Sequence, residues 1–154
     1  MTTTNTGRVG IPISKPDTIV RVALVGQRGT GKCSLVRRFS EDTFDADRES
    51  NDFFVPRIVH IDGKIVKLFI DNGFNDFLRQ EAIGQTCSPT RYRGTEGVLA
   101  IYDTTDASSF HKLRHCIEEV TKRNNKTIMT IVVGNKCDLT TERKVRGDVV
   151  RVAG

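Results

Sequence analysis

The run Ile19-Val-Arg-Val-Ala-Leu-Val25, followed by Gly26-Gln-Arg-Gly-Thr-Gly-Lys32, is the stretch that decides the fold. Its first part is β-branched and almost continuously apolar, which is the pattern of a strand buried on both faces of a parallel sheet. Gly26 ends the strand, and from Lys32 to Ser40 the apolar residues recur at helical spacing. The order of strand, glycine-rich loop and helix predicts an α/β domain.

The rest of the chain repeats this alternation. The predicted strands are residues 54–61, 65–71, 98–102 and 128–133. Asp62-Gly63 joins the first two strands and is a hairpin turn signal. Between the last two strands, residues 108–124 carry apolar side chains on one helical face, and we expect Ser108 to cap this helix. A mostly parallel sheet with one antiparallel hairpin and flanking helices follows.

Length and composition indicate one soluble domain. The chain has 154 residues, of which 37% are hydrophobic and 28% charged. Residues 1–17 are polar and punctuated by Gly and Pro, so we interpret them as a flexible leader and 18–154 as a single domain. No apolar run reaches the roughly 20 residues of a membrane span, and the N-terminus lacks the apolar segment of a secretory signal. Four cysteines without a C-x-x-C pair argue against zinc and disulfides.

The charge balance does not identify a partner. Lys and Arg outnumber Asp and Glu by 24 to 19, giving a net charge of +5, which would permit binding to phosphates, nucleic acid or anionic membrane. The basic residues are spread along the chain, aromatic residues are only 6%, and no RNA-recognition or zinc-finger pattern is present. We therefore interpret the charge as solvated surface and expect no nucleic-acid partner.

A phosphate-binding loop is predicted where the first strand ends. The stretch from Gly26 to Lys32 matches G-x-x-x-x-G-K, in which backbone N–H groups wrap a phosphate and the lysine neutralises it. An ordinary turn with a surface lysine is the alternative, and the flanking strand and glycine spacing speak against it. The residues expected at the phosphates are Gly26, Arg28, Gly29, Thr30, Gly31, Lys32, Cys33 and Ser34.

Cys33 departs from the pattern, which has Ser or Thr after the lysine. A hydroxyl there binds Mg²⁺, a hard ion that prefers oxygen, and a thiol fits it poorly. Ser34 carries a hydroxyl, but one position along a helix points roughly 100° away. Weakened Mg²⁺ binding is the expectation.

Asn135-Lys-Cys-Asp138 follows the predicted strand 128–133 closely, at another carboxyl end. Downstream of a phosphate loop, it resembles the N-K-x-D guanine motif of the Ras superfamily, in the form found in Rab proteins. The resemblance implies a small G-domain of the P-loop NTPase fold that binds GTP and GDP with Mg²⁺. By it, Asp138 accepts hydrogen bonds from guanine, Asn135 supports the loop, and the Lys136 stem covers the ring. In isolation the tetrapeptide would be a solvated turn.

The resemblance extends over roughly residues 18–150, with gaps. Leu35-Val-Arg-Arg-Phe-Ser-Glu-Asp-Thr-Phe44 is similar to the first Rab helix, and Phe44 falls where the family places an aromatic edge against guanine. A packing role for Phe44 stays open. Tyr92-Arg-Gly94 and the later Tyr102-Asp-Thr-Thr-Asp106-Ala-Ser-Ser-Phe110 also follow the Rab pattern.

The two switch regions depart from the family. The metal positions by resemblance are Cys33, Asn51 and Asp71, and Asn51 stands where the family has threonine. Asp71-Asn-Gly73-Phe74 is one residue short of Asp-x-x-Gly-Gln, so Gly73 would meet the γ-phosphate and Phe74 replaces the glutamine that orients water. Arg28 either pairs with phosphate or blocks an incoming arginine. Whether GTP is hydrolysed at all is left open.

The C-terminal part is short by the same comparison. After Leu139 the resemblance leaves the family's last strand and final helix without counterpart, and from Glu142 onward we expect only the start of a basic helix. No C-terminal cysteine pair for prenylation is present, so neither a lipid anchor nor a transmembrane segment is expected.

The resemblance implies a molecular switch in vesicle traffic or signalling, with impaired GTP hydrolysis. Effectors and regulatory proteins are its implied partners, and we expect a cytoplasmic monomer, at most peripheral to endomembranes. Two alternatives stay open: a pseudo-GTPase that serves as an interaction scaffold, and a P-loop ATPase or kinase, against which the N-K-x-D loop speaks.

Overall fold

The computed structural model describes residues 15–41, 54–71, 92–122, 124 and 127–146. In chain order its elements are β1 (Thr18–Val25), α1 (Lys32–Glu41), β2 (Phe54–Ile61), β3 (Lys64–Asp71), β4 (Gly97–Asp103), α3 (Ala107–Lys122), β5 (Met129–Asn135) and the short 3₁₀ helix η1 (Thr140–Glu142). Every strand and helix predicted from the sequence within these ranges is present, with ends shifted by one or two residues, except at the chain's C-terminal side.

The strands form one sheet in the order β2-β3-β1-β4-β5. β1 is parallel to β3 and β4, and β4 is parallel to β5, whereas β2 pairs antiparallel with β3. The hairpin turns at Asp62 and Gly63, which both have positive φ, as a two-residue turn between twisted strands requires. The predicted fold class is confirmed: an α/β domain with a mostly parallel sheet and one antiparallel hairpin.

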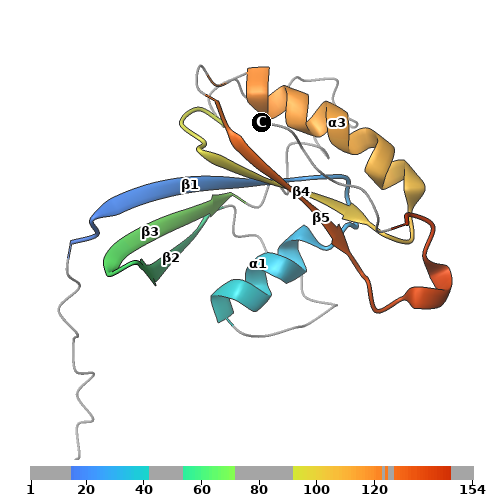
Figure 1. The fold of residues 1–154 in the computed structure, drawn as a ribbon, viewed down its shortest axis with the longest axis horizontal. Helices are drawn as coiled ribbons and strands as arrows, with labels where there is room; N and C mark the ends of the chain where they lie inside the picture. The colour runs from blue at the N-terminus through green and yellow to red at the C-terminus, as the bar shows by residue number, and fades with distance from the viewer. Residues whose placement is uncertain (1–14, 42–53, 72–91, 123, 125–126, 147–154) are drawn as a thin grey trace, which may run out of the picture.

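The helices lie on opposite faces of the sheet, α3 on one and α1 on the other (Figure 1). α3 buries Leu113, Cys116 and Val120, which recur at helical spacing and pack with side chains of β1 and β4. On the other face α1 contributes Val36 to a smaller cluster with Leu24 and Ile101. An apolar groove of about 510 Å³, lined by side chains of β1, β3, β4, β5 and α1, lies beside that cluster.

The N-terminal cap of α3 is Asp106, so the prediction that Ser108 caps this helix was wrong. The Asp106 carboxylate accepts a hydrogen bond of 2.9 Å from the Ser108 N–H. Ser108 is the second residue of the helix, and its N–H is one of the donors that a capping side chain satisfies.

The predicted basic helix from Glu142 is absent from the described residues. Glu142 ends η1, and Arg143 has an extended backbone. The N–H groups of Lys144 and Val145 donate to the Thr104 carbonyl at 2.9 and 3.0 Å, which holds this segment against the end of β4 instead of in a helical turn. Residues 147–154 lie outside the described residues.

At the other end, Asp17 is already tied to the fold. Its N–H donates to the Ile65 carbonyl at 2.8 Å, and its carboxylate accepts from the Ile65 N–H at 2.7 Å. The proposed leader otherwise falls mostly on residues 1–14, outside the described part. None of the helices described is both long enough and apolar enough to cross a membrane.

Candidate functional site

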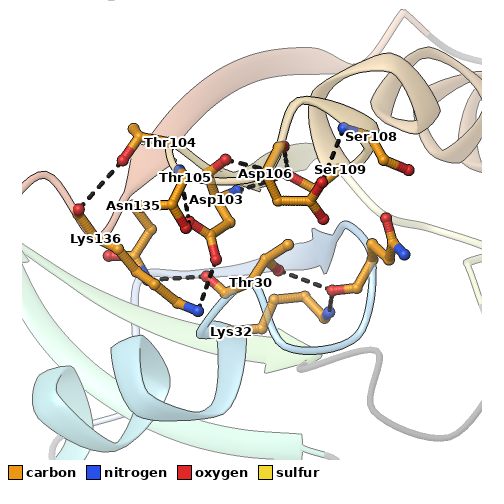
Figure 2. A network of polar contacts seen from close by, with 11 residues as sticks. Thr30, Lys32, Asp103, Thr104, Thr105, Asp106, Ser108, Ser109, Asn135 and Lys136 are labelled. Carbon is orange, nitrogen blue, oxygen red and sulfur yellow. Dashed lines mark hydrogen bonds and ion pairs between the residues drawn. The ribbon is translucent and has the colours of Figure 1, made fainter. Parts of the chain in front are cut away.

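The carboxyl ends of β1, β4 and β5 lie at one edge of the sheet, because the three strands are parallel neighbours. In open α/β sheets this edge is where ligands bind. The glycine-rich loop follows β1 there and the loop 135–138 begins at the end of β5. Figure 2 shows the two loops side by side, with the Asn135 side chain reaching Thr30.

Positive φ angles and close neighbours both favour glycine at two positions of the first loop. Gly26 and Gly31 have positive φ, and so does Gly29 between them. A side chain on Gly26 would collide with the main-chain oxygen of Ile101, and one on Gly31 with the amide nitrogen of Asn135. The glycine spacing thus lets the loop turn tightly against β4 and the end of β5.

The buried Lys32 side chain stabilises the first loop by donating hydrogen bonds to its main chain. It is 8% exposed, and its ammonium donates to the carbonyls of Gly26 and Gln27, both at 2.8 Å. Thr30, which is buried, donates from its hydroxyl to the same Gln27 oxygen at 2.9 Å. An ammonium has three N–H donors, so one is left for an anion.

Burial lowers the pKa of the Lys32 ammonium, because the charged form is poorly solvated there. An anion placed beside Lys32 would favour the charged form again. Lys32 is also the first residue of α1, so the loop leads directly into the N-terminus of that helix, the end that favours anions. The arrangement fits a phosphate group.

The second loop meets the first directly. The side-chain amide of Asn135 donates to the Thr30 carbonyl at 2.9 Å, a contact between residues 105 positions apart. Lys136 follows with φ of 61°, a left-handed backbone that is uncommon for a residue with a side chain. Asp138 is exposed, and its main-chain oxygen accepts from the Thr140 N–H at 2.9 Å. Asn135 therefore joins the two loops predicted to hold phosphate and base.

Asp103 and Thr104, at the end of β4, were not among the predicted site residues. The Asp103 carboxylate lies 2.7 Å from the Lys136 ammonium and accepts two hydrogen bonds from Thr105 (Figure 2). Burial acts to raise the pKa of Asp103, but the hydrogen bonds from Lys136 and Thr105 outweigh it and hold that pKa below its ordinary value. Both residues follow a predicted strand at its carboxyl end, which is the signal that could have identified them.

The metal positions inferred from the resemblance are only partly described. Cys33 and Ser34 lie half-buried in the first turn of α1, and Asp71 is buried at the end of β3, which is parallel to β1 and ends at the same edge. Arg28 is exposed in the phosphate loop. Phe44, Asn51, Gly73 and Phe74 lie outside the described residues. Within the described part, Cys33, Cys116 and Cys137 form no disulfide.

Comparisons with known proteins identify the family of this chain. The Ras family model matches residues 21–152. The GTP-binding protein YPT1 of Saccharomyces cerevisiae is 37% identical over 141 residues, covering 90% of this chain and 66% of that protein. The Ras-related protein Rab-18 is 37% identical over 144 residues in Caenorhabditis briggsae (91% and 68%) and 40% over 130 residues in Caenorhabditis elegans (82% and 61%).

The chain thus spans between 61% and 68% of the length of these relatives. The family model covers most of the chain, and the residues it covers include both loops at the sheet edge. The chain therefore belongs to the Ras superfamily of small GTPases and resembles its Rab branch.

Proposed function

We propose that this chain binds GTP and GDP at the sheet edge and acts as a nucleotide-dependent switch. The observation that carries the proposal is the hydrogen bond from the Asn135 amide to the Thr30 carbonyl. This contact brings a phosphate-type loop and a base-type loop within reach of one ligand. A relative of this chain is named a GTP-binding protein, which agrees with the proposal.

Different residues would bind the phosphates and the base of the nucleotide. Lys32 and the N–H groups of the turn 26–31 would hold the phosphates, with Lys32 supplying its third donor and its buried charge. Asp138 would accept hydrogen bonds from guanine, and the Lys136 stem would cover the ring. A carboxylate acceptor left without donors is costly once it is desolvated, so the site would reject adenine.

We propose that hydrolysis is slow. Mg²⁺ supplies charge neutralisation for phosphoryl transfer when bound, and by resemblance Asp71 and Cys33 would be among the residues that hold it. The carboxylate of Asp71 suits this ion, whereas the thiol of Cys33 does not. Phe74 stands where a glutamine would orient water, and a phenyl ring cannot do so. Asn51 replaces a threonine of the first switch.

The proposal extends to the setting of the switch. A Rab-type domain comprising residues 18–154 would act as a monomer through effectors and regulators in vesicle traffic, in the cytoplasm or at the surface of endomembranes.

Exchange measurements with fluorescent GDP and GTP, with and without Mg²⁺, test this function. We expect binding of both nucleotides at micromolar concentration or below, displacement by unlabelled GDP but not ADP, and single-turnover GTP cleavage far slower than product exchange. Displacement by ADP would instead indicate an ATPase or kinase site.

A second candidate is favoured by Cys33, which removes a metal ligand from the phosphate loop. In this case the domain is a pseudo-GTPase that serves as an interaction scaffold. Absence of binding at micromolar GDP and GTP would favour the scaffold and contradict the switch.

A further inference from the structure

The loop 135–138 is held by residues that belong to neither nucleotide motif. Thr104 is 1% exposed and uses all three of its main hydrogen-bonding groups. Its N–H donates to the Asn135 carbonyl at 3.0 Å, and its carbonyl accepts from Lys144 and Val145. Its hydroxyl donates to the Lys136 carbonyl at 3.1 Å. Thr104 therefore connects the end of β4 to the loop and to the segment that follows η1.

The Thr104 hydroxyl contacts the main chain of Lys136, a residue with an unfavourable backbone conformation. Lys136 adopts the left-handed region, where the side chain crowds the following carbonyl. Its own carbonyl accepts hydrogen bonds from two directions, from the Thr104 hydroxyl and from the Leu139 N–H at 3.2 Å. These two bonds offset the cost of the left-handed turn.

Asp103 fixes the far end of the same side chain. Its carboxylate is 2.7 Å from the Lys136 ammonium, and its second oxygen is occupied by the N–H and hydroxyl of Thr105 at 2.8 and 2.7 Å. The Asp103 N–H donates to the hydroxyl of Ser109 in the first turn of α3 at 2.9 Å. Thr105 thus holds one oxygen of the carboxylate, and Ser109 of α3 holds the Asp103 main chain (Figure 2).

We propose that Asp103 and Thr104 are positioning residues that set the loop 135–138 before a guanine nucleotide enters, Thr104 through the main chain of Lys136 and Asp103 through its ammonium. The inference rests on the proposed function, because it concerns the base-contacting half of the same site. A loop that is already ordered loses little conformational entropy on binding, so its contacts contribute more fully to affinity.

The proposal predicts that substitutions at these residues weaken binding of the base and not of the phosphates. Loss of the Thr104 hydroxyl should weaken binding of ligands that carry guanine and leave binding of a base-free polyphosphate unchanged, because the turn 26–31 is held by its own contacts. GDP and inorganic pyrophosphate are the two probes. A general loosening of the fold would weaken both equally.

The test is calorimetry of Thr104→Val, Thr104→Ser and Asp103→Asn with each probe. We expect Thr104→Val to raise the Kd for GDP about tenfold, the effect of one lost hydrogen bond, with the pyrophosphate Kd unchanged within a factor of about two. Thr104→Ser, which keeps the hydroxyl, should retain wild-type GDP affinity. Asp103→Asn should raise the GDP Kd by roughly threefold because a partly exposed ion pair contributes less.

Thr121→Val is the matched control. Thr121 donates its hydroxyl to the Ile117 carbonyl within α3, away from the sheet edge, so this variant should bind both probes as the wild type does. If Thr104→Val does not fold, Asp103→Asn provides the test instead. A raised Kd for GDP with an unchanged Kd for pyrophosphate in that variant would support the inference.

Unchanged GDP affinity in folded Thr104→Val, or equal loss of GDP and pyrophosphate binding, would overturn this inference alone. A wild-type chain that binds neither probe would overturn the proposed function and this inference with it.

Discussion

The two loops at the sheet edge are held in different ways. The phosphate loop is held mainly from within, because Lys32 and Thr30 donate to main-chain oxygens of Gly26 and Gln27. The Asn135 amide adds one bond from outside, to the Thr30 carbonyl. The loop 135–138 is held from outside, by Asp103 and Thr104 more than 30 positions earlier in the sequence. The phosphate loop should therefore tolerate changes elsewhere in the fold, whereas the base loop should respond to substitutions that never contact a nucleotide.

The substitution with the largest expected effect on nucleotide affinity is in the phosphate loop. Lys32→Ala removes a buried ammonium and its two bonds to the turn, and we expect the Kd for GDP to rise at least roughly 100-fold, the loss of strong charge-assisted contacts. Fluorescent GDP titration measures it, with Lys64→Ala, an exposed lysine at the hairpin, as the matched control. Near-wild-type affinity in folded Lys32→Ala would show that the loop does not bind phosphate.

Asp138→Asn addresses the base loop. The carboxylate is exposed and in our proposal accepts from two guanine donors, so an amide should lose one acceptor and face a mismatched donor. We expect GDP affinity to fall by roughly 30-fold, while a diphosphate of xanthine, which has a carbonyl in place of the amino group, binds better than GDP. Competition titrations compare the two ligands, and an unaltered preference for GDP would remove Asp138 from the site.

Cys33→Ser tests the metal position next to the phosphate loop. Replacing a soft thiol by a hydroxyl should restore an oxygen ligand, so the ratio of GDP affinity with Mg²⁺ to that in a chelator should rise by about tenfold. Cys137→Ser exchanges the same atoms at an exposed thiol that donates to the Gly134 carbonyl, and it should leave the ratio unchanged. An equal change in both variants would point away from metal coordination.

The smallest expected effect is on the free energy of unfolding, and it comes from the ion pair between Asp103 and Lys136 of the base loop. Because the pKa of Asp103 is lowered in the fold, its ionised form stabilises the protein above the ordinary pKa of an aspartate. That contribution is lost as pH falls through the lowered value. We expect Asp103→Asn to reduce the free energy of unfolding by about 1 kcal/mol at pH 7, limited by the partial exposure of Lys136.

Urea unfolding of the wild type and Asp103→Asn at pH 7 and near pH 3 gives the comparison. The difference between the two proteins should shrink as the pH falls from the ordinary pKa of an aspartate toward the lowered pKa of Asp103. A difference that is the same at both pH values would mean that the ion pair with Lys136 does not stabilise the fold.

The sequence predicted well what depends on neighbouring residues. The apolar run of β1, the glycine turn and the helical spacing after Lys32 are local patterns, and the hairpin at Asp62 and Gly63 is set by two residues. The fold class followed from the order of such patterns. The resemblance to Rab proteins then supplied the role proposed for residues 135–138, which spacing alone would have left as a turn.

What the sequence did not predict depends on distant pairs. No local pattern indicates that Thr104 donates to the Lys136 carbonyl, since the partners meet only after β4 and β5 align in register. The cap of α3 was misassigned by two positions because Asp106 and Ser108 are both good capping residues. Within the described residues the helix expected from Glu142 is absent, and main-chain bonds to Thr104 hold residues 144 and 145 instead.

The most direct measurement of the central claim is the identity of the nucleotide released when the purified chain is denatured. The account predicts GDP or GTP, close to one equivalent per chain. Release of an adenine nucleotide, or an empty chain that also fails to take up micromolar GDP, would contradict the joining of a phosphate loop and a guanine loop in one site.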